Sequence, residues 1–343
     1  MSPEVRQAVI MVGGLGTRLL PLTETRPKPA MPVLDRPFLK YLIDSIARAG
    51  IEEVILACGY KSDILAKEIG DGSDMGVRIL YSDEDTPLGT GGAIKSLEDR
   101  LDDVFVAANG DTLTSVDVGA QIEEHFSSGA MVTVSLSEVE DPSSSGVAVI
   151  DSEGRITAFQ EKPKREEALS HLVNSGLYVV DKRVLRYIPE KSFYDFSKEL
   201  FPLLLEKGER MQGHMARGIW IDIGKPLDLI RMNLTMAERL YPGQDWSGRV
   251  TESDVKGTFY IGEGSEFSHS ASSDSVVSEG CTIKESKLSG SFIMKGSCIE
   301  GATVVRSIVG EGCIIKNGSV VTDSVLRDGT VLEAGSVTVG RMG

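Results

Sequence analysis

A sequence repeat in the C-terminal part of the chain constrains the fold more than any other feature. Glycines recur there at intervals of 16, 16, 16 and 17 residues, each in a similar tripeptide: Gly264, Gly280, Gly296, Gly312 and Gly329. Between them aliphatic residues fall six apart, as in Ile293, Ile299 and Val305. One aliphatic residue in six, three times per period, predicts a three-sided parallel β-helix. An ideal coil would take about 18 residues, so we expect one corner to be tight.

The repeat also resembles the left-handed hexapeptide-repeat β-helix family. Two of the four cysteines, Cys281 and Cys313, share a frame position with Ser297 and Thr330. Being two coils apart, they would stand roughly 9–10 Å apart. A disulfide needs Cα atoms nearer than about 7 Å, so we expect stacked thiols and no bridge.

The chain before the repeat alternates strand-like and helix-like segments. This rhythm predicts a Rossmann-like α/β fold, with a mixed, mostly parallel sheet and flanking helices. From about residue 131 the strands become more antiparallel in pattern. The expected strands lie at 7–12, 53–59, 77–82 and 104–111, and the expected helices at 38–50, 62–70, 91–101, 195–207 and 226–240. The expected domains are 1–240, a linker over 241–254, and the β-helix over 255–343.

Charge narrows the classes of partner. With 36 Lys and Arg against 51 Asp and Glu, the formal net charge is -15. This disfavours nucleic acid and anionic lipid as partners, because both attract basic surfaces. Residues 1–40 depart from this balance, with six bases and three acids.

Neither a membrane segment nor a metal-binding cysteine motif is expected. No run approaches about 20 apolar residues, so we expect no membrane span. None of the four cysteines forms a C-x-x-C pair, which disfavours a structural zinc site. A reduced, cytoplasmic protein is the expectation.

The segment GGLGTRLLPLTETRPKPAMPV, residues 13–33, directly follows the first expected strand. Its glycines would let the backbone pass close to a phosphate chain, and Arg18 and Lys28 add cations. Neither the dinucleotide fingerprint nor the phosphate-loop motif fits this string. A glycine-rich hairpin with surface charges is the alternative. The whole string, GGxGTRLxPLT…PKPxxPV, resembles the sugar-1-phosphate nucleotidyltransferase family.

Five further strings continue this resemblance in order: LGTGGA (88–93), NGD (109–111), EKP (161–163), NSG (174–176) and WIDIG (220–224). The resemblance implies catalytic roles for Arg18 and Lys28, and Asp111 and Asp222 as ligands of Mg²⁺. The implied nucleotide-binding residues are Gly13, Gly14, Gly16, Thr17, Leu88, Gly89, Thr90 and Gly91. The implied sugar-phosphate residues are Glu161, Lys162 and Asn174, with Gly146 as a weaker candidate.

Each of these residues also has a structural reading. Singly, Asp111 and Asp222 would be strand-end carboxylates that cap turns. Glu161 and Lys162 could form an exposed charged turn, and Asn174 could be a turn residue.

The expected reaction transfers a nucleotidyl group from an NTP to a sugar 1-phosphate and releases pyrophosphate. LGTGGA resembles the loop of guanylyltransferases, so GTP with mannose 1-phosphate is the leading pair. Glucose 1-phosphate with UTP or dTTP is the alternative within the class. A β-helix acyltransferase and a non-catalytic regulatory subunit are alternatives of other classes. We also expect a homo-oligomer, a dimer or tetramer, assembled through the β-helix.

Overall fold

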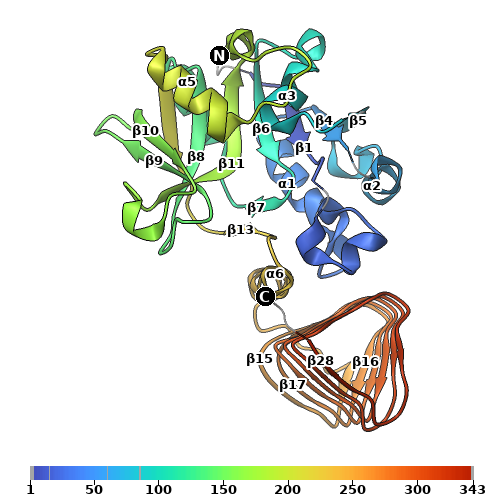
Figure 1. Ribbon diagram of the computed structural model, residues 1–343. Coiled ribbons are helices and arrows are strands. Elements are labelled where there is room, and N and C mark those ends of the chain that lie inside the picture. The colour runs from blue at the N-terminus through green and yellow to red at the C-terminus, as the bar shows by residue number, and fades with distance from the viewer. Residues whose placement is uncertain (1–3, 15, 60, 85, 341–343) are drawn as a thin grey trace. The chain divides into compact units, whose positions relative to one another are not determined.

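The computed structural model describes residues 4–14, 16–59, 61–84 and 86–340. The chain forms two compact units (Figure 1). Unit 1 comprises Met1–Gly14 with Leu39–Ile221, and unit 2 comprises Leu15–Phe38 with Asp222–Gly343. The segment 15–38 therefore groups with the C-terminal strands, which the sequence pattern did not indicate. The boundaries expected near residues 240 and 255 remain a prediction.

Unit 1 is built on a nine-stranded sheet whose main path runs β10-β9-β11-β6-β1-β4-β5. Strands β4, β1 and β6 are parallel to one another, and β11 runs antiparallel to β6. The mostly parallel start and the antiparallel continuation are as predicted. The strands of this sheet are β1 (Gln7–Met11), β4 (Glu53–Cys58), β5 (Arg78–Asp83), β6 (Val104–Asn109), β8 (Val132–Glu138), β9 (Gly146–Ile150), β10 (Ile156–Glu161), β11 (Leu172–Asp181) and β12 (Met211–Met215).

Four of the described helices of unit 1 overlap the expected ones, although some are shorter, and a fifth, Val118–Ser128, was not expected. The segment expected as one helix over 91–101 is divided into a short α-helix and a 3-10 turn. The segment expected over 195–207 begins with a π-turn, Phe196–Leu200. The helices are α1 (Phe38–Ala47), α2 (Ser62–Ile69), α3 (Gly89–Lys95), α4 (Val118–Ser128) and α5 (Phe201–Glu206), with 3-10 turns at Ser73–Met75, Glu98–Arg100, Arg165–Glu167 and Lys182–Tyr187.

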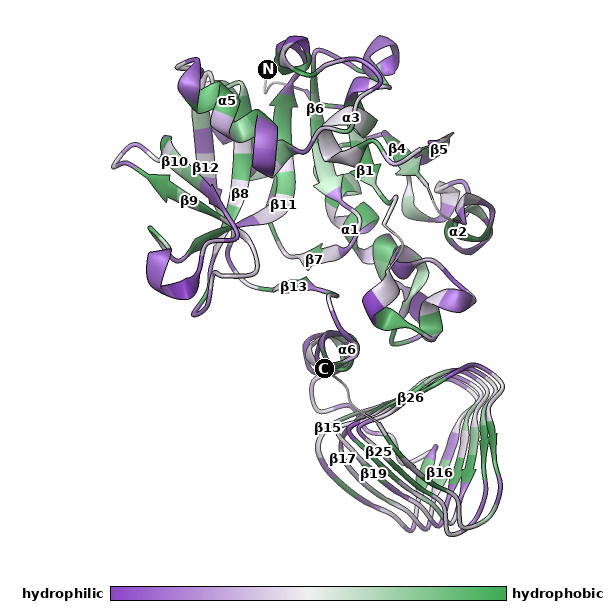
Figure 2. Cartoon of the chain, viewed as in Figure 1, coloured by the Kyte–Doolittle hydropathy of each residue, from purple (hydrophilic) through white to green (hydrophobic). Residues whose placement is uncertain are grey.

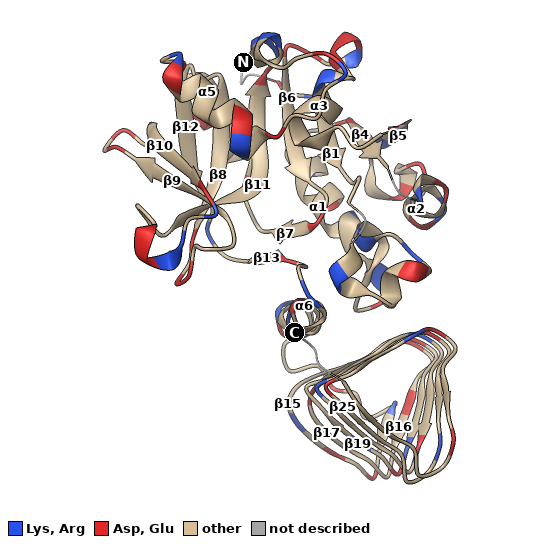
Figure 3. Cartoon of the chain, in the orientation of Figure 1, with Lys and Arg blue, Asp and Glu red and all other residues tan. Residues whose placement is uncertain are grey.

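The core of unit 1 lies between the sheet and these helices. Strand residues such as Val9, Phe105 and Val134 are fully buried together with Phe201 of α5. The strands are largely hydrophobic and carry few charges, whereas charged residues gather on helices and loops (Figures 2 and 3). Two short strands, β7 (Thr112–Thr114) and β13 (Trp220–Asp222), form a separate pair.

Unit 2 contains the segment 15–38, helix α6 (Pro226–Leu240) and the predicted three-sided parallel β-helix (Figure 1). Every coil pairs in register with the next, as in Ile283↔Ile299↔Ile315. The β-helix strands are β14 (Val250–Thr251), β15 (Asp254–Ile261), β16 (Glu266–Ser268), β17 (Ala271–Val277), β18 (Thr282–Lys284), β19 (Lys287–Ser289), β20 (Phe292–Ile293), β21 (Cys298–Glu300), β22 (Thr303–Val305), β23 (Ile308–Val309), β24 (Ile314–Ile315), β25 (Val320–Thr322), β26 (Val325–Leu326), β27 (Val331–Leu332) and β28 (Val337–Val339).

The 16-residue period has a physical cause in the corners. Each corner holds one residue with positive φ, for example Gly280, Glu285 and Gly290 in one coil and Gly296 at the start of the next. Two sides of a coil therefore advance by five residues and the third by six. The expectation of one tight corner was wrong, because the shortening is shared between two sides. All four cysteines are free, as expected for stacked Cys281 and Cys313.

The rest of unit 2 has little regular secondary structure. Segment 15–38 holds three 3-10 turns, Thr17–Leu19, Leu22–Glu24 and Lys28–Ala30, and the strands β2 (Pro32–Val33) and β3 (Arg36–Pro37). Helix α6 packs on β2, β15 and β17. Within the described ranges, none of the helices combines the length and the apolar character that crossing a membrane requires.

Candidate active site

The glycine turn after β1 lies at the carboxyl end of the parallel strands, where ligands bind in such sheets. Gly13 and Gly59, which follow β1 and β4, come so close that a Cβ on Gly59 would lie 3.2 Å from Gly13 Cα. A Cβ on Gly14 would meet no described atom within 4 Å. Packing therefore explains why residue 59 is glycine, but it does not explain Gly14. The open space beside Gly14 leaves its backbone accessible to a ligand.

Unit 2 holds the other half of the glycine motif. Gly16 has φ of 61°, and Thr17 opens the turn that carries Arg18. Thr23 Oγ1 donates a hydrogen bond of 3.1 Å to the Gly16 carbonyl. A Cβ on Gly16 would lie 3.0 Å from Thr23 and 3.2 Å from the Lys28 side chain, so only glycine fits between them. The motif is thereby folded back on itself, with Gly16 beside Lys28.

Two predicted catalytic residues and one predicted metal ligand meet within unit 2. Lys28 is only 7% exposed, and its ammonium lies 3.3 Å from a carboxylate oxygen of Asp222. Arg18 reaches the turn that follows Asp222, because a Cβ on Gly224 would lie 3.4 Å from Arg18 Nη1. This cluster can therefore meet an anion with two cations.

The end of β6 carries Asp111 and a residue that sequence reasoning missed. Gly110 packs directly on β1, since a Cβ there would lie 2.8 Å from the Met11 carbonyl oxygen. Asp111 follows with its carboxylate 3.4 Å from Thr112 Oγ1. The side-chain oxygen of Asn109 is buried and has no hydrogen-bond partner among the described residues. Asn109 is the first residue of the string NGD, so the motif contained this signal.

The loop 88–91 is held mainly by the protein itself. The N–H of Gly91 donates to the Tyr194 carbonyl at 2.8 Å, and the Leu88 carbonyl accepts from the Tyr194 N–H at 2.9 Å. Thr90 Oγ1 accepts from the Phe196 N–H at 2.8 Å. A Cβ on Gly89 would lie 2.7 Å from the Tyr194 carbonyl oxygen. Packing against 194–196 therefore accounts for the glycines, and the expected nucleotide contacts remain a prediction.

Half-buried Glu84 precedes this loop and was not among the predicted site residues. One of its carboxylate oxygens accepts a hydrogen bond from the Leu88 N–H at 3.2 Å. Burial raises the pKa of Glu84, although this hydrogen bond opposes the shift. The carboxyl group thus orders the start of the loop. No sequence pattern marked it.

Three of the four predicted sugar-phosphate residues come together at one end of the β9–β10 hairpin. Gly146 pairs with Glu161 in the antiparallel register, and a Cβ on Gly146 would lie 2.6 Å from the Phe159 ring. Lys162 has φ of 47° and a largely exposed side chain whose ammonium lies 3.5 Å from Glu161. A lysine in this left-handed conformation costs of order 1–3 kcal/mol, and such strain gathers at functional sites. The hairpin thus presents a cation and a carboxylate side by side.

The side-chain amide of the fourth residue, Asn174, forms hydrogen bonds within the protein. Its amide nitrogen donates to Tyr178 Oη at 2.9 Å and to Ser197 Oγ at 3.1 Å. Its amide oxygen accepts from the Gly176 N–H at 2.9 Å. These bonds lie where the pairing of β11 with β8 shifts register. Asn174 therefore shapes the irregular part of β11, and its contact with a sugar remains a prediction.

The chemistry of the donors fits the predicted magnesium ion. Carboxylate oxygens are hard ligands, and Mg²⁺ is commonly held by one or two carboxylates together with substrate phosphates. Asp111 belongs to unit 1 and Asp222 to unit 2. Within the part of the chain that the structure describes, no group of three or more His, Cys, Asp and Glu residues could hold a metal ion. Substrate and water oxygens would have to complete the coordination.

Comparison with known proteins now identifies the family. Residues 7–239 match the family described as Nucleotidyl transferase. A mannose-1-phosphate guanylyltransferase from Mycobacterium tuberculosis is 38% identical over 254 residues, which cover 74% of this chain and 70% of the relative. A UTP–glucose-1-phosphate uridylyltransferase from Synechocystis is 34% identical over 65% of this chain and 61% of the relative.

A solved structure is also similar to this chain. HddC from Yersinia pseudotuberculosis, crystallised in complex with GMP-PN, is 27% identical with a TM-score of 0.58, and the match covers 68% of this chain and all of that one. The family match and the guanylyltransferase relative each span most of this chain, and the family match over residues 7–239 includes the strings from GGLGTRL to WIDIG. The chain belongs to the nucleotidyl transferase family.

Proposed function

We propose that the protein transfers a nucleotidyl group from an NTP to a sugar 1-phosphate, giving an NDP-sugar and pyrophosphate. The observation that carries the proposal is the cluster of Arg18, Lys28 and Asp222 in unit 2. Two cations beside one carboxylate suit a polyanionic substrate with a bound divalent ion. The glycine turn at Gly13 and Gly14 supports the proposal, because its backbone can approach phosphates.

The chemistry asks for positioning and charge neutralisation. A phosphate oxygen of the sugar phosphate attacks the α-phosphorus in line, and the bond to pyrophosphate breaks. The nucleophile is already anionic, so no general base is needed. Lys28 would neutralise the α-phosphate, and Arg18 the departing pyrophosphate. Lys162 would hold the sugar phosphate with Glu161 beside the sugar hydroxyls, while Asn174 and Gly146 would line the same side.

We also propose that the reaction is magnesium-dependent. Asp111 and Asp222 would hold the ion, which would supply positive charge to neutralise the phosphates. Support comes from the donor chemistry and from the position of both residues in family-like strings. Titration with EDTA should abolish pyrophosphate release, and added Mg²⁺ should restore it. Full activity in the presence of EDTA would contradict the metal assignment.

For the substrates, we propose GTP and mannose 1-phosphate. The relatives named as mannose-1-phosphate guanylyltransferases, including a beta catalytic subunit from Danio rerio that is 33% identical over 71% of this chain, support this pair. The GMP-PN complex of HddC also favours a guanine nucleotide. The uridylyltransferase relative keeps UTP with glucose 1-phosphate as the second candidate.

A pyrophosphate-release assay without acetyl-CoA tests these proposals together. Five NTPs are each combined with mannose, glucose and other sugar 1-phosphates. We expect the highest kcat/KM with GTP and mannose 1-phosphate. Preference for UTP or dTTP with glucose 1-phosphate would support the second candidate. Absence of turnover with every pair would overturn the enzymatic proposal and favour a regulatory subunit.

An acyltransferase activity of the β-helix has little support from the residues. The histidine of the β-helix, His269, has a half-exposed side chain 3.0 Å from Glu252, at a corner of the first coils. Acetyl transfer from acetyl-CoA to any sugar phosphate of the panel would contradict this reading.

We infer that the protein is a cytoplasmic homo-oligomer assembled through the β-helix. The last coil exposes Val337 and Val339, each 70% accessible, and its strand β28 lies at the end of its sheet. An exposed apolar strand edge favours association. Light scattering should show a smaller mass for the V337K/V339K variant than for the native chain. An unchanged mass would contradict assembly through this coil.

A further inference from the structure

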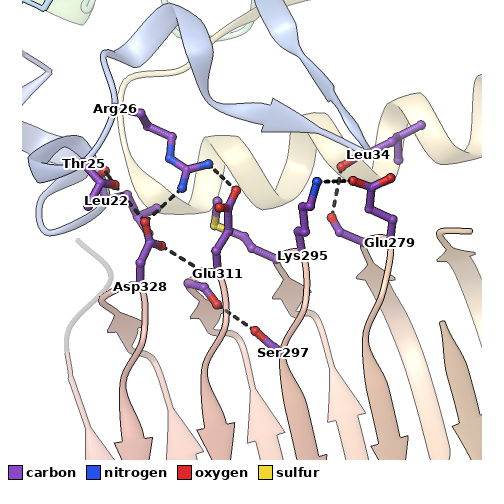
Figure 4. A network of polar contacts seen from close by, with 12 residues as sticks. Leu22, Thr25, Arg26, Leu34, Glu279, Lys295, Ser297, Glu311 and Asp328 are labelled. Carbon is purple, nitrogen blue, oxygen red and sulfur yellow. Dashed lines mark hydrogen bonds and ion pairs between the residues drawn. The ribbon is translucent and has the colours of Figure 1, made fainter. Parts of the chain in front are cut away.

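Arg26 joins the signature segment 15–38 to the β-helix. Its guanidinium forms ion pairs with Glu311 and with Asp328, the latter at 2.9 Å. Both carboxylates stand on one corner of the β-helix, in successive coils, and Figure 4 shows Arg26 pointing down between them. Asp328 is itself fixed, because its other oxygen accepts from the Glu311 N–H at 2.8 Å. One cation is thus held by two carboxylates from a rigid repeat.

This contact is largely sheltered from water. The side chain of Arg26 is 16% exposed and that of Asp328 is 18% exposed. Burial alone would lower the pKa of Arg26, but the bonds and charges of Glu311 and Asp328 raise it. Thr25 Oγ1 adds a hydrogen bond of 2.8 Å to Asp328, and Glu24 pairs with Arg327 at 2.6 Å. Removing one partner from such a group would leave a sheltered charge uncompensated, which is strongly destabilising to the local contact.

A second anchor holds the same segment a few residues later. Asp35 accepts from the Glu279 N–H at 2.8 Å and from Tyr260 Oη at 2.6 Å. Ser278 Oγ donates to the Leu34 carbonyl at 3.0 Å, a bond also drawn in Figure 4. The segment is therefore fixed to the β-helix on both sides of Lys28.

The chain between the two anchors is short and stiff. Pro27 separates Arg26 from Lys28, and Pro29 and Pro32 follow, so few backbone torsions are free. Lys28 in turn packs on Gly16, and so on the turn that carries Arg18. A shift of the Arg26 anchor would therefore move both cations of the candidate site.

We propose that Arg26 is a positioning residue for the transfer reaction, and that its ion pairs with Glu311 and Asp328 make the β-helix a required support of the site. This inference rests on the proposed function. Misplacing a catalytic group by about 1 Å can cost roughly 10²-fold in rate. Loss of the anchor should therefore lower kcat, although the guanidinium of Arg26 is itself occupied by Glu311 and Asp328.

Steady-state kinetics of Arg26→Gln and of the double variant Glu311→Gln/Asp328→Asn test the proposal. Each should lose at least tenfold in kcat with its best substrate pair. The three changes combined should lose no more than either alone, because they remove the same contact. Arg26→Lys should recover part of kcat, since an ammonium still reaches one carboxylate.

The matched control is Arg306→Gln, which breaks a bidentate pair with Asp323 at 2.6 Å between two coils of the same β-helix. This pair does not involve segment 15–38, so the kcat of the Arg306→Gln variant should stay within twofold of the native value. An Arg26→Gln variant that resembles this control would overturn the inference. If Arg26→Gln does not fold, as judged by circular dichroism, the single variants Glu311→Gln and Asp328→Asn decide the question by the same criterion.

The same experiment separates the two proposals. A native protein that turns over no substrate pair refutes the proposed function. A native protein that is active while the anchor variants match Arg306→Gln refutes only the role of Arg26.

Discussion

The sheet of unit 1 and the β-helix of unit 2 both rest on parallel strands, but they join residues over very different distances. In the sheet, Ala8 pairs with Val54 on one side and Val106 on the other. In the β-helix, Ile299 pairs with residues 16 positions before and after it. A repeat whose units contact only neighbours gains stability coil by coil. The sheet closes only when distant segments return, so its residues depend on one another across the whole unit.

The strongest predicted loss of activity follows from substitutions outside the repeat, at the residues proposed to act on the phosphates. Arg18→Ala and Asp111→Asn should each lower kcat/KM by about 10³-fold or more, because the first removes a cation proposed to neutralise the pyrophosphate and the second a proposed ligand of Mg²⁺. Melting temperatures should change little. The matched change in the repeat, Lys287→Ala at an exposed position, should leave the kinetics unaltered. Near-normal pyrophosphate release from either of the first two variants would contradict the assignment.

A pair of identical core substitutions tests the contrast in cooperativity. Ile10 in β1 and Ile299 in β21 are both fully buried, and replacing either by alanine should cost about 2–5 kcal/mol of unfolding free energy. For Ile299→Ala, hydrogen exchange should increase in the adjoining coils and not in β1 and β6. For Ile10→Ala it should increase across the sheet. If the increase in hydrogen exchange spread equally far in both variants, the two units would not differ in cooperativity.

The pH dependence of stability should come partly from a buried histidine of unit 1. Burial lowers the pKa of His125 to about 4, and its Nδ1 lies 3.0 Å from Thr133 Oγ1. In the unfolded chain His125 binds a proton with a pKa near 6.5, whereas in the folded chain it does so only near pH 4. The free energy of unfolding therefore falls as the pH drops from 6.5 to 4. Going from pH 7 to pH 5 should cost about 2 kcal/mol.

Urea unfolding at the two pH values measures this effect. The variant His125→Gln, which cannot take up the proton, should lose less stability on acidification than the native chain. An identical loss in both proteins would remove His125 as the cause.

The smallest expected effect concerns the corners of the β-helix. Gly296→Ala places a methyl group in open space at φ of 69°, so it should cost only about 1 kcal/mol of backbone strain. Gly301→Ala adds a clash, because the new Cβ would lie 2.4 Å from Asn317 Oδ1. Thermal melting should rank Gly301→Ala below Gly296→Ala. The reverse order would show that the contact of residue 301 with Asn317 does not determine the difference in stability.

The same contrast explains what the sequence could predict. In the repeat, residues one period apart pair with each other, so the spacing in the sequence predicts the contacts. The three faces and the free thiols of Cys281 and Cys313 could therefore be predicted from residue intervals alone. The shared shortening of two sides could not, since it depends on positive φ at residues such as Glu285, which no propensity marks. In the first 240 residues, strand and helix patterns were clear, but they carry no information about which distant strand each will pair with.

The candidate site was predictable as a set of motifs, and less so as a set of contacts. The pairing of Lys28 with Asp222 joins residues 194 apart, and the anchor of Arg26 joins residues 285 apart. Nothing local encodes such separations. Asn174 and Thr90 stood out as motif residues, yet their side chains are spent on Tyr178, Ser197 and Phe196. The buried oxygen of Asn109 depends on packing around Gly176, which only the folded chain reveals.

The anchor of Arg26 also has a consequence for biosynthesis. Arg26 is translated 285 residues before Glu311, which at about 5–20 residues per second is a delay of roughly 15–60 s. Throughout that time the nascent chain holds a complete glycine motif without its β-helix support. A translation product that stops before Glu311 would therefore carry the motif without this support, and we expect it to be inactive. Activity would then have to wait for the coils that carry Glu311 and Asp328.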